Sequence, residues 1–302
     1  EEAVRRVEKI VGRPIPFVKA ELCDPAQVED LFVRYPDIDA VIHFAGLKAV
    51  GESVSKPLEY YTNNLVNSLV LLNAMRRHGV KNFVFSSSAT VYGDPASVPI
   101  REDFPTGGTT NPYGTTKLFL ERILTDYCAA DPTMNVALLR YFNPIGAHES
   151  GLIGEDPKGI PNNLVPYIAQ VAVGKLKELH VYGDDYPTPD GTGVRDYIHV
   201  VDLARGHVAA LKKLDQNCGL FVCNLGTGKG YSVLDVLHAY EKACGKTLPY
   251  VVDPRRPGDI AVCYADPTKA KEELGWEAKY GIEDMCASSW KWQSMNPNGY
   301  RG

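Results

Sequence analysis

Short apolar runs alternate with helical patterns along the first half of the chain, and this alternation restricts the fold more than any other feature. Residues 39–44, 82–88 and 136–142 read as buried strands, and the second of them ends in three serines. A helical pattern covers residues 57–80, and another helix is predicted to begin near residue 112. The first helix is expected to carry Leu65, Leu69, Leu72 and Met75 along one apolar stripe. This βαβαβ order predicts an α/β fold with a parallel, doubly wound sheet.

The second half of the chain has a different composition. After Asn143 the sequence becomes richer in Gly, Pro and Asn, which is typical of a lobe built from loops. A chain of 302 residues is long enough for two lobes. We therefore expect a boundary between residues 142 and 143, with some later segments returning to the first lobe.

Composition and charge argue against several classes of function. The net charge of −5 and the pI of about 5.8 argue against nucleic-acid binding through a broad positive field. No apolar run approaches the ~18 residues of a membrane helix, so no membrane partner is expected. Seven scattered cysteines without Cys-x-x-Cys spacing suggest free thiols in a reducing compartment, the cytoplasm. The seven histidines lack ligand spacing, so no metal is expected.

The run from Asn111 to Lys117 carries a candidate proton acceptor. Asn111 suits a helix N-cap and Pro112 suits the first turn, so Tyr113 and Lys117 should project from one helix face. A phenol titrates near 10, but a neighbouring ammonium favours the phenolate and lowers the pKa. The Tyr-x-x-x-Lys spacing alone is weak, because an interfacial tyrosine beside a solvated lysine is the more frequent cause.

The serine-tipped strand strengthens this hypothesis. Strands of open α/β sheets place ligand-binding residues at their carboxyl ends, and Ser86, Ser87 and Ser88 stand there. We expect the Ser88 hydroxyl to share a substrate oxygen with Tyr113.

Seven segments together carry a resemblance to a known family: residues 43–53, 86–93, 111–117, 139–144, 154–157, 159–164 and 190–200. Over nearly its whole length the chain closely resembles the UDP-galactose 4-epimerases, also called UDP-glucose 4-epimerases, which are extended short-chain dehydrogenases/reductases. The resemblance implies an NAD-binding Rossmann-type domain over residues 1–142, without its first β-α-β unit. It also implies a mainly UDP-sugar-binding lobe over residues 143–302, and a homodimer.

The family reaction is a transient, NAD-dependent oxidation at C4 of the sugar. By resemblance, Tyr113 takes the C4 hydroxyl proton, Lys117 lowers the Tyr113 pKa and contacts ribose, and Ser88 positions the substrate oxygen. The resemblance implies these NAD-side positions: Glu21, Leu22, Phe44, Ala45, Lys48, Asn64, Ser86, Tyr113, Lys117 and Tyr141. It implies these substrate-side positions: Ser88, Asn143, Asn163, Leu164, Tyr182, Arg195, Tyr197, Arg256, Asp259 and Cys263. Arg195 and Arg256 suit a pyrophosphate, because guanidinium forks match phosphate oxygens.

Two departures from the family pattern concern the cofactor. No glycine-rich loop precedes the first strand, and we expect that a segment on the order of forty residues, with two strands, is missing. The glycines of the run 224–230 come too late and predict a plain turn. Glu21 stands where the family usually has an aspartate near the adenine.

Cys263 bears on substrate range. Members that admit N-acetylated sugars have a small residue at this position, and narrower members have a tyrosine. The resemblance therefore implies that UDP-GlcNAc and UDP-GalNAc are also interconverted.

Two other functions remain open at this stage. A related nucleotide-sugar dehydratase or decarboxylase is one, but Ala89 and Thr90 follow Ser88 where a dehydratase needs an acid–base pair. The other is a non-catalytic nucleotide-sugar-binding fragment.

Dimerisation has weak support of its own from the apolar residues Leu118, Phe119, Leu120, Ile123 and Leu124 on the Tyr113 helix.

Overall fold

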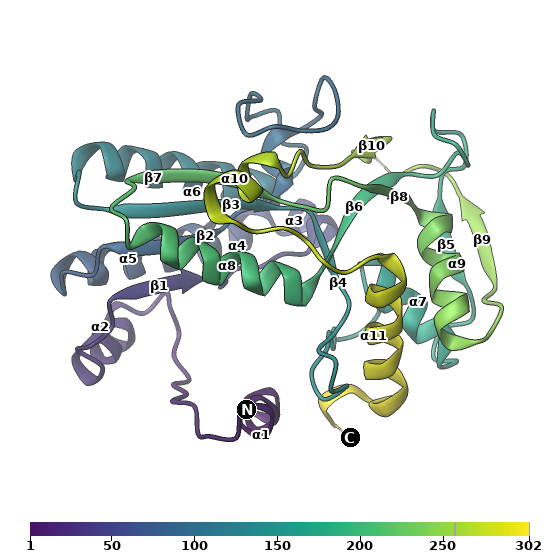
Figure 1. Cartoon of the computed structure of the whole chain (residues 1–302), viewed down its shortest axis with the longest axis horizontal. Coiled ribbons are helices and arrows are strands. Elements are labelled where there is room, and N and C mark those ends of the chain that lie inside the picture. Colours follow the sequence, from purple (N-terminus) through teal and green to yellow (C-terminus); the bar gives the residue numbers. More distant parts are fainter. Residues whose placement is uncertain (257, 302) are drawn as a thin grey trace.

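A four-stranded parallel sheet forms the centre of the first part of the molecule. The computed structural model describes residues 1–256 and 258–301 (Figure 1). The strands are β1 (Ala40–His43), β2 (Asn82–Ser86), β3 (Asn135–Tyr141) and β7 (Leu220–Leu225). They pair in the order β1-β2-β3-β7, and every pair is parallel. The predicted strands at residues 39–44, 82–88 and 136–142 are thus confirmed within one or two residues.

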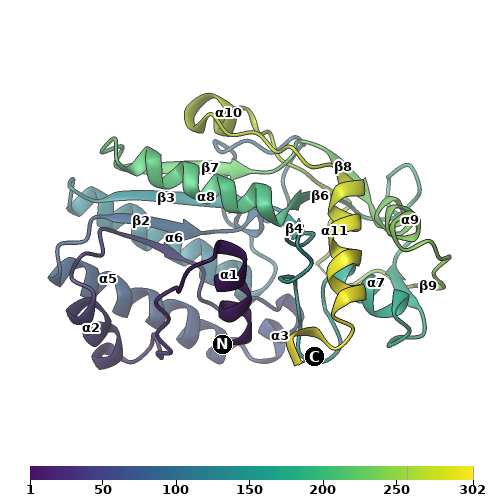
Figure 2. The ribbon, with the colours of Figure 1, turned by 60° about the horizontal axis from the view of Figure 1, so that its bottom comes forward.

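Helices cover both faces of this sheet (Figure 2). On one face lie α2 (Pro25–Arg34), α5 (Asn67–Arg77) and α6 (Pro112–Ala130), and on the other lie α8 (Val200–Leu214) and α10 (Thr268–Leu274). Alternate strand residues point to opposite faces, so Phe83 and Phe85 pack with the first group while Val84 packs with the second. The doubly wound α/β fold predicted from the sequence is confirmed.

A second region is built from shorter strands. Strand β6 (Val194–His199) pairs in parallel with β4 (Asn143–Ile145) and β10 (Val262–Cys263), and antiparallel with β8 (Gly230–Ser232). Strands β5 (Leu179–Tyr182) and β9 (Tyr250–Asp253) form a separate parallel pair. Helices α7 (Leu164–Ala172), α9 (Val233–Cys244) and α11 (Ile282–Met295) surround a common core with them (Figure 1).

The chain passes between the two regions more than once. Strand β7 comes from the second half of the sequence yet pairs with β3, and α8 and α10 pack on the first sheet. Strand β3 runs on into β4, which pairs with β6. The first sheet therefore contains a strand from the second half of the sequence, and the chain continues directly from β3 of the first sheet into β4 of the second region.

The helix predicted over residues 57–80 is interrupted. The structure has α3 (Val50–Ser55), α4 (Pro57–Tyr61), a π-helical turn over Thr62–Val66, and then α5. Leu72 and Met75 are buried as predicted, but Leu69 is 40% exposed. Leu69 and Met75 are both in α5, after the π turn, and lie roughly 120° apart around a helix of about 3.6 residues per turn, so they do not share one narrow face. The predicted apolar stripe was therefore wrong at Leu69.

The N-terminal helix α1 (Glu2–Val11) lies beside α11 and the C-terminal end, away from the first sheet (Figures 1 and 2). Arg6 sits over the rings of Trp292, at 5.7 Å, and Tyr300, at 5.0 Å. Its guanidinium also donates to the Leu152 carbonyl and the Asn296 side chain. Two 3₁₀ turns complete the elements, at Ala89–Tyr92 and Gly299–Arg301.

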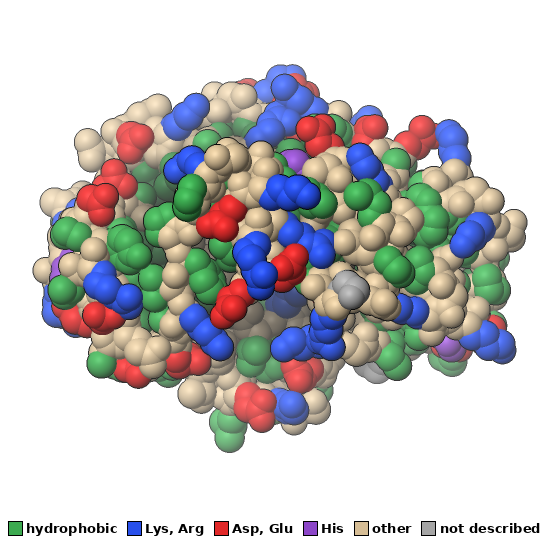
Figure 3. Space-filling view, turned by 90° about the horizontal axis from the view of Figure 1, so that it is seen from below, with side chains coloured by type: hydrophobic (Ala, Val, Ile, Leu, Met, Phe, Trp, Pro, Cys, Tyr) green, Lys and Arg blue, Asp and Glu red, His purple; other side chains and the backbone are tan. Residues whose placement is uncertain are grey.

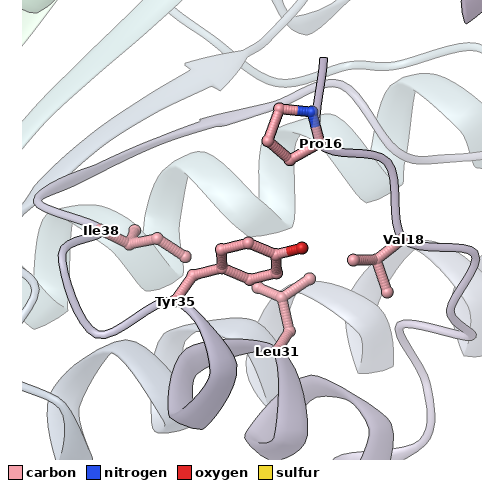
Figure 4. A pocket seen from close by; sticks show the side chains of 5 residues that line it. All are labelled: Pro16, Val18, Leu31, Tyr35 and Ile38. Atoms are coloured by element: carbon pink, nitrogen blue, oxygen red, sulfur yellow. The ribbon is translucent and has the colours of Figure 1, made fainter. Parts of the chain in front are cut away.

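One open pocket lies near the free edge of β1. Its lining residues are Pro16, Val18, Leu31, Tyr35 and Ile38, from α2 and the segments that flank it (Figure 4). None of these side chains is charged, so the pocket offers no cation to a phosphate. Within residues 1–256 and 258–301, no helix is long and apolar enough to cross a membrane.

Candidate active site

Helix α6, which carries Tyr113 and Lys117, begins as its sequence predicts. The Asn111 side chain accepts a hydrogen bond of 2.8 Å from the Gly114 N–H, and Pro112 occupies the first turn of α6. This cap satisfies a backbone donor at the start of the helix. Because Tyr113 and Lys117 are four residues apart, they project from the same face, and the Lys117 ammonium lies 5.9 Å from the Tyr113 ring centroid.

The end of β2 meets this face of α6. Lys117 Nζ donates a 2.7 Å hydrogen bond to the Ser86 carbonyl, and the Ser88 hydroxyl lies near enough to the Tyr113 phenol to oppose the rise of its pKa. Ser88 also caps the 3₁₀ turn that follows, and Thr90 donates to its hydroxyl through both its backbone N–H and its side chain. The structure thus brings together the three predicted catalytic residues.

Burial dominates the titration of this pair. The Tyr113 ring keeps some exposure, but burial around its hydroxyl raises its pKa, and Tyr141 adds to this while the Ser88 hydrogen bond opposes it. Burial lowers the pKa of Lys117 to about 8. The Tyr113 pKa therefore moves opposite to the direction expected from the sequence, because loss of hydration is the largest influence on the phenol.

A histidine that sequence analysis missed organises the predicted cofactor side. His207 of α8 is buried and lies 4.7 Å from the ring of Phe44 and 5.9 Å from that of Tyr141. Its Nδ1 is 2.9 Å from the Leu203 carbonyl, which can only accept, so Nδ1 carries the proton. Burial lowers the His207 pKa, and in the neutral ring Nε2 accepts from the Ser86 hydroxyl at 3.1 Å.

Asn64 lies in the π-helical turn and is buried. Its Oδ1 accepts from the Leu47 N–H at 2.7 Å, and its Nδ2 donates to the Leu47 carbonyl and to Thr116 Oγ1. The side chain therefore joins the loop after β1 to α6. Its amide is already engaged by the protein, which leaves it little capacity for a cofactor.

The other predicted cofactor-side residues are spread along the β1 loop and the segment before α2. Phe44, Ala45 and Lys48 are exposed on the loop, and Lys48 pairs with Glu155 at 3.2 Å. Glu21 accepts from the Cys23 N–H, and Leu22 packs against the core beneath α2 and α5. The contacts of Glu21 and Leu22 in the described chain do not reach Tyr113, Lys117 or Ser88.

Two pairs of predicted substrate residues are neighbours in the second sheet. Arg195 of β6 is in register with Cys263 of β10, and Tyr197 is in register with Asn143 of β4. Because Arg195 and Tyr197 are two residues apart on one strand, they face the same side. Burial raises the pKa of the Cys263 thiol to about 11, which keeps it protonated near neutral pH.

Of the remaining substrate-side residues, Tyr182 ends β5 and Leu164 begins α7, and the others lie on loops. Arg256 stands 4.8 Å over the Tyr182 ring and donates to Asp259 at 2.9 Å. Asn163, just before Leu164 at the start of α7, donates to Glu155 at 3.4 Å. Since Lys48 also pairs with Glu155, that carboxylate links the β1 loop with the loop before α7. The surface drawn in Figure 3 carries Lys and Arg interleaved with Asp and Glu.

The glycine run at 224–230 is a turn, as predicted, and it encloses a carboxylate. Asp196 of β6 is buried and accepts from the backbone N–H groups of Thr227, Gly228 and Ala265 and from the Thr227 hydroxyl. The turn thus binds an anion, but the anion belongs to the protein itself. Asp196 connects β6, the glycine turn and the chain just after β10.

Comparisons with known proteins show which family the chain belongs to. A family model described as GDP-mannose 4,6 dehydratase matches residues 2–289. A UDP-glucose 4-epimerase of Bacillus subtilis is 63% identical over 300 residues, which cover 99% of this chain and 88% of that protein. The corresponding mouse protein, also named UDP-glucose 4-epimerase, is 60% identical over 299 residues, with 99% of this chain and 86% of that protein covered.

Among solved structures, a UDP-glucose 4-epimerase from Bifidobacterium longum in complex with NAD+ and UDP matches with a TM-score of 0.95. It is 65% identical, and the match covers 98% of this chain and 88% of that one. The relatives carry the name of the epimerase that the sequence motifs indicate, not of the rival dehydratase or decarboxylase. The chain belongs to the UDP-glucose 4-epimerases, a family of extended short-chain dehydrogenases/reductases.

Proposed function

We propose that this chain interconverts UDP-galactose and UDP-glucose by NAD-dependent oxidation and re-reduction at C4 of the sugar. The observation that carries the proposal is the meeting of Tyr113, Lys117 and Ser88 where α6 crosses the end of β2. A hydroxyl and a phenol on one substrate oxygen can hold it and move its proton.

In this reaction Tyr113 accepts the C4 hydroxyl proton and later returns it. Ser88 hydrogen-bonds the same oxygen and keeps it within reach of the phenol. The Tyr113 pKa must fall for this role, and a protonated Lys117 favours the phenolate. A cationic nicotinamide near the pair would favour it further.

Residues around Lys117 fit an NAD molecule. Its ammonium has three donors, and the described contacts use one of them, on the Ser86 carbonyl, so two can reach ribose hydroxyls. Phe44 is 59% exposed and rests on His207, which makes an apolar platform beside Ser86 and Tyr141. NAD, when bound, supplies the hydride acceptor and then the hydride donor at the sugar C4. We propose that Glu21, Leu22, Ala45, Lys48 and Asn64 line the remainder of the NAD site, Asn64 indirectly through the Leu47 loop.

We propose a division of binding between the two halves of the substrate. Arg195 and Arg256 hold the UDP pyrophosphate, with Asp259, Tyr182, Asn163 and Leu164 around the nucleotide, while Asn143 and Tyr197 face the sugar. An epimerase must present both faces of the C4 ketone to the hydride, so the sugar must turn while UDP stays bound. Strong charge-assisted contacts to UDP and few contacts to the sugar meet that requirement.

The test is conversion of UDP-galactose into UDP-glucose by the purified chain with NAD supplied. Turnover that is lost in Tyr113→Phe, with UDP binding retained, supports the proposal. Binding of UDP-sugar without turnover by the unchanged chain would sink it and favour a binding role.

We further propose that the enzyme also interconverts UDP-GlcNAc and UDP-GalNAc. Cys263 is a small side chain beside Arg195, and it leaves room that a tyrosine would fill. Cys263→Tyr should remove activity on the N-acetylated sugars and spare UDP-galactose. Equal loss, or no loss, on both pairs of substrates would contradict this assignment.

We also propose a homodimer in the cytoplasm, with residues 1–142 mainly holding NAD and residues 143–302 mainly holding UDP-sugar. Leu58 of α4, Leu69 of α5 and Phe119 of α6 are 79%, 40% and 47% exposed. Exposed apolar side chains on neighbouring helices suit contact with a second copy of the chain. The seven cysteines form no disulfide among the described residues, which suits a reducing compartment. Phe119→Glu should shift the sedimentation of a dimer to that of a monomer, whereas an unchanged mass would argue against this surface.

A further inference from the structure

Three residues on one face of α6 meet three consecutive serines at the end of β2. Tyr113, Lys117 and Glu121 are each four residues apart, so their side chains follow one another along the helix. Ser88 lies beside Tyr113, and Lys117 donates to the Ser86 carbonyl. Glu121 accepts from the Ser87 hydroxyl at 2.6 Å. The first two contacts belong to the proposed active site, and the third has no role there.

Glu121 also forms a buried ion pair. Arg140 of β3 donates from Nε to Glu121 Oε1 at 3.0 Å and from an NH2 group to Oε2 at 2.7 Å. Both side chains are almost fully buried, with exposures of 6% and 8%. A carboxylate held by a forked guanidinium and a hydroxyl is fully hydrogen-bonded, which makes its position well defined.

The same ion pair reaches the chain on the other side of Ser88. Arg140 donates to the Tyr92 hydroxyl at 3.0 Å and to the Glu102 carbonyl at 3.2 Å, and Tyr92 donates to Asn224 of β7 at 2.7 Å. Ser88 therefore lies in a short segment that the network holds at both ends, at Ser87 and at Tyr92. These contacts fix the backbone on both sides of Ser88, and Thr90 donates to the Ser88 hydroxyl itself.

We infer that Glu121 is a positioning residue for the epimerisation, acting through Ser87 and Arg140 to hold Ser88 opposite Tyr113. The inference rests on the proposed function, because it assigns a role in that reaction. Glu121 touches neither substrate nor cofactor in this account. Its effect is geometric, and a displacement of ~1 Å between reacting groups can lower a rate by as much as ~100-fold.

The least disruptive variant for the test, Ser87→Ala, removes one hydroxyl and leaves the Glu121–Arg140 ion pair intact. In Ser87→Ala, Glu121 keeps both contacts with Arg140 but no longer holds the β2 end. We expect kcat for UDP-galactose to fall about tenfold, with KM within a factor of two, because the proposed UDP contacts lie in the second region. The matched control is Ser289→Ala, which also removes a buried hydroxyl. The Ser289 hydroxyl lies 3.4 Å from the Tyr240 hydroxyl, in the core among α7, α9 and α11. The control should leave kcat unchanged.

A double-mutant cycle separates positioning from general stability. If Glu121 acts through Ser87, then Ser87→Ala adds little further loss of kcat to Glu121→Gln, whereas independent effects multiply. Thermal unfolding of each variant shows whether the protein remains folded at the assay temperature. If Glu121→Gln does not fold, the Ser87→Ala and Ser289→Ala pair still decides the question.

The outcomes distinguish this inference from the function on which it rests. No turnover by the unchanged chain overturns both. Turnover by the unchanged chain together with wild-type kcat in Ser87→Ala overturns the positioning role alone. The positioning role is also overturned if Ser289→Ala loses as much kcat as Ser87→Ala. It is overturned as well if the losses of kcat in Ser87→Ala and Glu121→Gln multiply in the double variant.

Discussion

The two regions of the molecule hold their functional residues in different ways. In the first region, Ser88 and Lys117 are 8% and 6% exposed, and they sit between a helix and a strand end joined by buried hydrogen bonds. In the second region, Arg256 and Asn163 lie on exposed loops and pair with carboxylates near the surface. The difference suits the proposed reaction, since proton transfer needs fixed geometry while nucleotide binding needs access and charge.

The proposed cationic residues of the two regions also differ in burial. Around Tyr113 and Lys117 it favours the neutral form of both groups, so the chemistry depends on charges that arrive with the ligands. Arg256, by contrast, is a solvated cation that can meet an anion without losing much hydration. We therefore expect substitutions in the first region to act on kcat or on folding, and those in the second on KM.

The largest effect is expected from Tyr113→Phe. Loss of the phenol removes the proposed proton acceptor but keeps the ring, so the fold should persist. We expect kcat to fall about 1,000-fold, within the usual range for a general acid–base group. The measurement is steady-state conversion of UDP-galactose, with circular dichroism as a check on folding. A loss smaller than about tenfold would mean that another group accepts the proton.

The next largest effect compares two arginines. Arg140→Met leaves Glu121 buried without its cationic partner, and we expect the free energy of unfolding to fall by about 3–5 kcal/mol. Arg256→Met breaks an exposed pair with Asp259, and we expect a change below about 1 kcal/mol. Urea denaturation of both variants measures the contrast. Similar changes in the two proteins would show that burial does not distinguish these ion pairs.

The third prediction concerns pH and Lys117. Its pKa in the folded protein is lowered from 10.5 to about 8, so between these values the unfolded chain binds more protons than the folded one. Stability contributed through Lys117 is therefore lowest below pH 8 and rises as the pH approaches 10.5. Relative to Lys117→Met, the wild type should gain up to about 3 kcal/mol of unfolding free energy across this window.

Denaturant titrations of both proteins at several pH values test this difference. Taking the difference between the two proteins removes the contribution of other groups that titrate above pH 8. Parallel curves for the two proteins would show that Lys117 keeps an ordinary pKa in the folded state.

The smallest expected effect lies at the proposed pyrophosphate site. Arg256→Met should raise KM for UDP-galactose about tenfold and leave kcat nearly unchanged, because the lost contact holds substrate and transition state alike. Initial rates over a range of substrate concentrations separate the two constants. A fall in kcat with constant KM would place Arg256 closer to the chemical step than we propose.

Local sequence patterns predicted the start of helix α6 and the strands of the first sheet well. The Asn111 cap, the Pro112 start and the spacing of Tyr113 and Lys117 depend on residues only a few positions apart. The apolar stripe across residues 57–80 was wrong at Leu69, which lies roughly 120° from Met75 around α5, a helix of about 3.6 residues per turn. The π turn between α4 and α5 also interrupts the predicted helix. No residue type in that segment marks the turn by itself.

Other parts of the site depend on contacts across long stretches of chain. Ser86 and His207 are 121 residues apart in sequence, and Ser87 and Glu121 are 34 apart, so no periodic pattern connects them. Glu121 did carry a local signal, since it continues the four-residue spacing of Tyr113 and Lys117. His207 carried none beyond being a histidine on an amphipathic helix.

Helix starts, strand runs and the Tyr-x-x-x-Lys pair were readable from the amino-acid order, because hydrogen bonding and side-chain spacing within an element involve near neighbours. The Glu121–Arg140 network and the direction of the Tyr113 pKa came from the folded arrangement alone. Desolvation depends on every atom packed around a group, and those atoms come from elements that meet only when the chain folds.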